Sequence, residues 1–130
     1  MVKLVIDTSA VVACLAGEPE RMAFIDRLQL ATQRDFSAMN LLEARLVLTF
    51  TKGLPAELID DFLLDYGVHV VPFDEDLSNL AFDAYRRYGK GRHPAKLNMG
   101  DCAAYALAKS RGWPLLYKGD DFVQTDIERA

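Results

Sequence analysis

Several features are scarce or missing in this 130-residue sequence, and each absence excludes a class of protein. Its two cysteines, Cys14 and Cys102, form no Cys-x-x-Cys pair, so free buried thiols in a reducing compartment are expected. No apolar run is long enough to span a bilayer, and the first such run meets Asp7 too early for the apolar core of a signal peptide. These absences favour a cytoplasmic protein without a membrane segment.

A basic surplus is also missing, because 19 acidic side chains face 15 basic ones and the formal net charge is -4. Domains that bind nucleic acids usually carry the opposite balance, so the global charge argues mildly against such a function. A cation bound among clustered carboxylates would weaken this objection, since it would cancel negative charge where an anionic substrate must lie.

The composition is that of an ordinary globular protein, with 51% hydrophobic and 26% charged residues. We find no internal repeat, linker or low-complexity stretch. A chain of this length can bury a sizeable core by itself. The sequence therefore predicts a single domain over residues 1–130.

Strand-like and helix-like segments alternate along the chain. The first segment, residues 2–6, is a continuous apolar run typical of a strand that is buried on both faces. Further short strands are predicted over 35–37, 68–72 and 114–117, and helices over 10–16, 18–33, 39–52, 55–66, 74–88 and 100–111. In the helix over 18–33 we expect Met22, Ile25, Leu28 and Leu30 to face inward. This alternation predicts an open parallel sheet covered on both faces by helices.

Two aspartates follow predicted strands at positions where open parallel sheets bind their ligands. Asp7 comes directly after the first strand, and Asp121 lies a few residues after the last. The alternative for Asp7 is a helix cap, because Asp7, Thr8 and Ser9 are all capping residues.

Glu43 lies in a segment whose neighbours are apolar nearly all round, which predicts a mostly buried helix. A lone buried carboxylate costs at least several kcal/mol unless it pairs with a cation or becomes protonated. Binding to a metal ion would explain why a carboxylate is found at position 43. A local salt bridge with Arg45 or another arginine is the alternative.

Asp101 begins an alanine-rich helix, which we expect to pack close to the sheet. Helix capping is the alternative role for this aspartate. Four carboxylates gathered at one sheet edge would repel each other by roughly 4 kcal/mol per close pair at an effective dielectric of 20. A bound cation reverses that sign, and oxygen ligands favour Mg²⁺ or Mn²⁺ over zinc. His69 and His93 stand alone in the sequence and are not expected to be ligands.

A basic run leads into the helix of Asp101 and contains Arg86, Arg87, Lys90, Arg92, His93 and Lys96. Such a run is often only a solvated face. It could also bind phosphates, because recognition of single strands uses a positive groove beside the active centre.

Four segments together carry a resemblance to a known family. They are Val-Ile-Asp-Thr-Ser-Ala at Asp7, Ala-Met-Asn-Leu-Leu-Glu-Ala at Glu43, the run 91–109 around Asp101, and Leu-Leu-Tyr-Lys-Gly-Asp-Asp-Phe with Thr125, Asp126 and Ile127. In this order and spacing the sequence resembles a VapC-type PIN-domain toxin over essentially its whole length.

The resemblance implies a three-layer α/β/α sandwich with a short, mostly parallel central sheet. It also implies a catalytic site of Asp7, Glu43, Asp101 and Asp121, with Asp120 as the alternative to its neighbour. Family members are endoribonucleases that use Mg²⁺ or Mn²⁺ and leave a 5′ phosphate and a 3′ hydroxyl. They form dimers and are neutralised by a cognate VapB-type antitoxin in a toxin-antitoxin assembly.

In such a site we expect Asp7 and Asp101 to bind the metal, which activates a water for hydrolysis of the phosphodiester. Glu43 and Asp121 would anchor a second ion or orient the water and the inner ligands. Candidate contacts to RNA are Thr8, Ser9, Arg87, Arg92 and Lys96. Two rival interpretations remain: a metal-dependent phosphatase or phosphoacceptor domain, and a binding module without catalytic activity.

Overall fold

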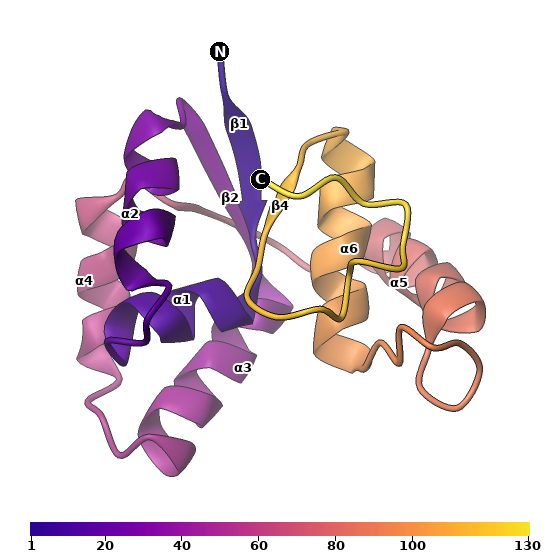
Figure 1. Ribbon diagram of the computed structural model, residues 1–130, viewed down its shortest axis with the longest axis horizontal. Helices are drawn as coiled ribbons and strands as arrows, with labels where there is room; N and C mark the ends of the chain where they lie inside the picture. The colour runs from indigo at the N-terminus through magenta and orange to yellow at the C-terminus, as the bar shows by residue number, and fades with distance from the viewer.

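The computed structural model describes all residues from 1 to 130, and its centre is a four-stranded parallel sheet with helices on both faces (Figure 1). This is the predicted fold class. The strands are β1 (Lys3–Ile6), β2 (Gln33–Ser37), β3 (His69–Val71) and β4 (Leu115–Leu116). The helices are α1 (Thr8–Leu15), α2 (Arg21–Leu30), α3 (Ala38–Leu46), the π-helix η1 (Val47–Thr51), α4 (Glu57–Asp65), α5 (Glu75–Tyr88) and α6 (Met99–Arg111). No helix is both long and apolar enough to cross a membrane.

Strand β1 is buried on both faces because side chains alternate across a strand. Leu4 and Ile6 belong to one core cluster, which includes Leu28 of α2 and Ile59 of α4. Val5 points the other way, into a second cluster with residues of α5 and α6. Figure 1 shows the same division, with α1 to α4 on one side of the sheet and α5 and α6 on the other.

The strand order, β3-β2-β1-β4, places the last strand beside the first. The chain leaves β1 toward β2 and β3 and later returns to the opposite side of β1, so the connections change direction between β1 and β4. Ile6 pairs with Leu116, and the Asp7 amide donates to the Leu116 carbonyl at 2.9 Å. Asp7 thus lies where a sheet of this type has its ligand-binding crevice.

The helix predicted over 18–33 is shorter and presents a different face. It starts only at Arg21, and Phe24 and Leu28 occupy the buried side. Met22 and Leu30 lie on the opposite side, 63% and 72% exposed, so placing them inward was wrong. Ile25 is half-buried, as an edge position between the two sides.

The helix predicted over 39–52 changes character part-way. It is α-helical to Leu46 and continues as η1, whose wider turn is closed by a hydrogen bond of 3.0 Å from the Lys52 amide to the Val47 carbonyl. The expectation of a mostly buried helix was wrong. Only a stripe at four-residue spacing is buried, namely Asn40, Ala44 and Leu48, whereas Leu42, Leu46 and Phe50 are exposed.

Candidate active site

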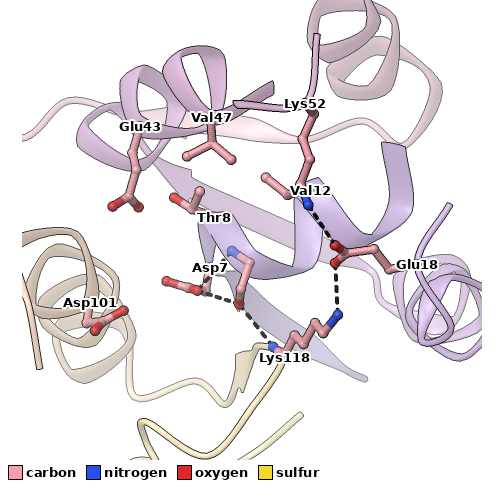
Figure 2. A pocket seen from close by; sticks show the side chains of 10 residues that line it. Asp7, Thr8, Val12, Glu18, Glu43, Val47, Lys52, Asp101 and Lys118 are labelled. Atoms are coloured by element: carbon pink, nitrogen blue, oxygen red, sulfur yellow. Dashed lines mark hydrogen bonds and ion pairs between the residues drawn. The ribbon is translucent and has the colours of Figure 1, made fainter. Parts of the chain in front are cut away.

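A cavity of about 330 Å³ lies at the carboxyl ends of β1 and β4 (Figure 2). Four carboxylates line it, and three of them lie together: Asp7 after β1, Glu43 from α3 and Asp101 from the first turn of α6. The other lining residues are Thr8, Ser9, Val12, Glu18, Val47, Lys52 and Lys118. In Figure 2 the three carboxylates lie at one side, and the two lysines meet Glu18 at the other.

Asp7 caps α1 with one carboxylate oxygen and leaves the other without a partner. The Ser9 amide and hydroxyl donate to Oδ2 at 3.0 and 2.6 Å, whereas buried Oδ1 accepts no hydrogen bond. Burial raises the pKa of Asp7 to about 6, although the bonds from Ser9 act against it. A buried acceptor without a hydrogen-bond partner lowers the stability of the fold by about 1 to 3 kcal/mol. A ligand that bound Oδ1 would remove this cost. Capping and ligand binding are therefore compatible roles for this residue.

Asp101 is fixed at the start of α6 by a reciprocal pair of hydrogen bonds. Its amide donates to the Asn98 side chain at 2.9 Å, and its Oδ2 accepts from the Asn98 amide at 3.1 Å. Burial raises the pKa of Asp101 to about 7, and the charges of Asp7, Asp121 and Glu43 raise it further. As predicted, the alanine-rich helix is closely packed, with every residue from Gly100 to Ala108 buried.

Glu43 reaches the cavity because α6 has no side chain at position 100. A Cβ built on Gly100 would collide with both carboxylate oxygens of Glu43. The alternative of an ion pair with Arg45 does not hold, since Arg45 pairs with Asp60 at 3.5 Å. Glu43 is only half-buried, so the large desolvation cost that the sequence suggested is not incurred.

Asn40 connects the three elements that carry these carboxylates, and the sequence did not single it out. Its Nδ2 donates to the Gly100 carbonyl at 3.0 Å, and its own carbonyl accepts from the Thr8 hydroxyl at 3.2 Å. Asn40 is fully buried and lies one turn before Glu43 on the same face of α3. That spacing of a polar residue and an acid in an apolar helix was the signal available in the sequence.

The hydroxyls of Thr8 and Ser9 line the cavity but are engaged within the protein. Thr8 donates to the Asn40 carbonyl, while Ser9 donates to Asp7 and accepts from the Lys118 amide at 3.0 Å. Both side chains thus position the first carboxylate. Their predicted contact with substrate stays a prediction.

Asp121, the fourth predicted acid, is exposed and does not line the cavity. Its charge still contributes to the raised pKa of Asp101. Phe122, next to Asp121, is buried against Tyr117 at a ring distance of 4.9 Å and anchors this loop. This effect on Asp101 is the feature that favours Asp121 over Asp120 as the fourth acid.

The basic run lies outside the cavity. Arg87 stacks on Tyr88 at 5.1 Å and lies 4.0 Å from Asp126, while Arg92 and Lys96 are exposed in the loop before α6. None of these three candidates for RNA contact lines the cavity. The two histidines are likewise remote: His69 faces Asp35 at 3.5 Å, and His93 lies in the loop.

Two lysines that the sequence did not single out line the cavity instead. Glu18 accepts from the Lys118 ammonium at 3.1 Å and from the Lys52 ammonium at 3.4 Å (Figure 2). Glu20 lies 3.4 Å from Lys118. The hydrogen bond to Glu18 raises the pKa of Lys118 above its usual value. No pattern in the sequence marks these residues, because they come from three separate segments.

The donor set matches a hard divalent cation in chemistry but is not closed around one point. All candidate ligands are carboxylate oxygens, and Oδ1 of Asp7 is buried without a partner. No three of the acidic, histidine or cysteine side chains converge closely enough to hold a metal as they lie. A bound cation would therefore have to draw these carboxylates together. Glu43 is half-buried and Asp121 is exposed, so both side chains have room to move toward the cation.

With this geometry in place, comparison with known proteins identifies the family. The family model for the PIN domain matches residues 4–128. Ribonuclease VapC30 of Mycobacterium tuberculosis is 45% identical over 125 residues, which are 95% of each chain. This chain belongs to the PIN-domain family, among the VapC ribonucleases.

Solved structures agree with this PIN-domain assignment at the level of the fold. The crystal structure of Mycobacterium tuberculosis VapC20, described as a sarcin-ricin loop cleaving toxin, matches with a TM-score of 0.79. It covers 98% of both chains at 18% identity. DNA-bound VapBC from Salmonella typhimurium matches with a TM-score of 0.73 and 18% identity, covering 99% of this chain and 96% of that one.

Proposed function

We propose that residues 1–130 form one PIN domain that acts in the cytoplasm as a metal-dependent endoribonuclease, the toxin of a toxin-antitoxin pair. The observation that carries this proposal is the acidic half of the cavity. Two buried carboxylates, Asp7 and Asp101, have pKa values raised to about 6 and 7, and one buried oxygen of Asp7 has no partner. Such carboxylates are stabilised when a cation binds between them.

Asp7 and Asp101 would hold Mg²⁺ or Mn²⁺, with Glu43 and Asp121 orienting the attacking water or completing the ligand set. When bound, the cation lowers the pKa of a water and offsets charge on the departing oxygen. The chain's own contribution is to fix the carboxylates. Ser9 holds Asp7, Asn98 holds Asp101, and the missing side chain at Gly100 gives Glu43 its place.

Support for RNA as substrate comes from the names of the relatives, which are ribonucleases at 40–45% identity over nearly the full chain. The basic loop before α6 is exposed beside the start of that helix and offers Arg92 and Lys96 to the substrate's backbone. Hydrolysis by an activated water would leave a 5′ phosphate and a 3′ hydroxyl.

Two apolar surfaces support the proposed protein partners. A groove of about 250 Å³ between α2 and α4 is lined by apolar side chains that include Ile25 and Phe62, by the acidic Asp61 and Asp65, and by one basic residue, Arg21. A VapB-type antitoxin segment with apolar and basic side chains would fit it. The second surface, around Phe82 of α5 and Met99 of α6, is the candidate contact for a homodimer within a larger toxin-antitoxin assembly.

The deciding experiment is RNA cleavage by purified, antitoxin-free protein with Mn²⁺, compared with the Asp101→Asn variant prepared in the same way. We expect the parent to cleave RNA, chelator to stop it, and the variant to lose at least about a hundredfold in rate. Equal cleavage by parent and variant would assign the activity to a contaminant. Release of phosphate from small phosphoesters with intact RNA would favour the phosphatase interpretation.

A further inference from the structure

We propose that Lys52 and Lys118 bind an RNA phosphate in the cavity, and that Glu18 holds the two ammonium groups until the phosphate replaces it. This inference rests on the proposed ribonuclease function and assigns the contact with substrate inside the same cavity. The observation behind it is the contrast between the two sides of the cavity in Figure 2.

Asp7, Glu43 and Asp101 line the cavity together, so an approaching polyanion meets negative charge at the place where it must bind. Lys52 and Lys118 are the only basic side chains that line it. The exposed arginines of the basic run do not, so the two lysines are the cations that already lie in the same cavity as the carboxylates.

Backbone hydrogen bonds fix the positions of both lysines. The Lys118 amide donates to the Ser9 hydroxyl, which in turn donates to Asp7, so the position of Lys118 is coupled to that carboxylate. Lys52 follows the π-helical turn closed on Val47, and the wide turn brings residues 47 and 52 to the same cavity. Wide turns of this kind occur frequently at functional sites.

Glu18 holds the two lysines weakly enough to be displaced by an anion. The side chains of Lys52, Lys118 and Glu18 are 38%, 35% and 20% exposed, and such partly exposed ion pairs contribute only about 0 to 1 kcal/mol. A phosphodiester oxygen can therefore replace the Glu18 carboxylate on the lysines at little cost. Glu18 also stands in for an anion in the absence of RNA, since one carboxylate accepts from two ammonium groups.

The test uses variants that separate binding from scaffolding. Lys52→Met and Lys118→Met remove the ammonium groups, and Glu18→Gln removes the competing charge while keeping the size of the side chain. Lys109→Met and Asp60→Asn are matched controls, because these residues form ion pairs with Asp126 and Arg45 outside the cavity. Binding of a labelled single-stranded RNA is measured by fluorescence anisotropy in chelator over a range of salt, and steady-state cleavage is measured with Mn²⁺.

We expect each lysine variant to bind RNA several-fold more weakly, with a salt slope reduced by about 0.7 for each lost phosphate contact. Glu18→Gln should act in the opposite direction and bind up to about fivefold more tightly than the Asp60→Asn control. In cleavage the lysine variants should show a raised KM, and Glu18→Gln a lowered one.

Unchanged affinity and slope in Lys52→Met would overturn the proposal, and this variant tests it even if Lys118→Met fails to fold. Weaker RNA binding by Glu18→Gln would also overturn the proposal. That result is expected if the ion pairs only hold the cavity in shape, because removing either the acid or a lysine would then disturb the site. Failure of the ribonuclease function would look different: the parent itself would leave RNA intact with Mn²⁺.

Discussion

The buried Asp101 carboxylate predicts an inverted dependence of stability on pH in the metal-free protein. Its pKa of about 7 in the folded state lies above the ordinary value of 3.8. Its protonated form is therefore favoured by folding, and this contribution to stability is fully present below pH 3.8 and is lost as pH rises through about 7. Between pH 5 and pH 8 the loss from this one group is about 2.5 kcal/mol, at 1.36 kcal/mol per pH unit.

Replacing Asp101 by Asn removes the charge and keeps an oxygen that can accept from the Asn98 amide. In chelator, the variant should thus become more stable than the parent by about 2.5 kcal/mol on going from pH 5 to pH 8. For a domain of this size that is roughly 10 °C in Tm. Asp7, whose own pKa is raised to about 6, is coupled to Asp101 because its charge raises the pKa of Asp101, so the difference between the two proteins belongs to the pair of carboxylates.

Thermal melts of the two proteins at pH 5 and pH 8, with chelator and then with Mn²⁺, provide the measurement. Added Mn²⁺ should restore the parent at pH 8 and leave the variant nearly unchanged, because the cation stabilises the charged carboxylates. Asp60→Asn, an exposed carboxylate, should show no such dependence. If the difference between Asp101→Asn and the parent were the same at both pH values, the raised pKa and the argument built on it would be refuted.

Three further outcomes are expected. Gly100→Ala should displace the Glu43 carboxylate and lower nuclease activity at least about tenfold. The control Gly112→Ala, at the exposed end of α6, should lower stability without that loss of activity. Equal activities of the two variants would show that the position of Glu43 does not depend on the missing side chain at Gly100. Glu43→Gln should leave the Tm within about 2 °C of the parent, since the side chain is half-buried, yet reduce cleavage about a hundredfold; normal cleavage would remove Glu43 from the site. Arg92→Gln should reduce the salt slope of RNA binding by about 0.7, and an unchanged slope would leave the loop as a solvated surface.

Some of the site could be predicted from sequence because its residues are tied to local features of the chain. Asp7 directly follows a buried strand, and Asp101 begins a small-residue helix, so their positions depend on the ends of elements that periodicity identifies. Asp7 also caps α1, and Asp101 completes the capping box of α6 with the N-cap Asn98. Helix capping and metal binding are therefore compatible roles for each aspartate. The capping hydrogen bonds use Oδ2, and Oδ1 of Asp7 has no hydrogen-bond partner.

Predictions that depended on which face of a helix is buried were less successful. Glu43 was expected within a buried helix, yet Leu42 and Leu46 beside it are exposed, because packing selected the stripe of Asn40 and Ala44. Apolar side chains on the outer face leave no periodic signal to separate a surface helix from a buried one. The inward placement of Met22 failed for the same reason.

The sequence alone determined the alternation of strands and helices, the parallel sheet and the aspartates at its edge, because these follow from local periodicity and from the general placement of ligands in such sheets. The tertiary structure decided what meets across the cavity. Two sets of hydrogen bonds join segments that are 34 to 100 residues apart: the bond from Asn40 to Gly100, and the bonds from Lys52 and Lys118 to Glu18. Contacts at such separations are set by the packing of whole elements, which local periodicity does not encode.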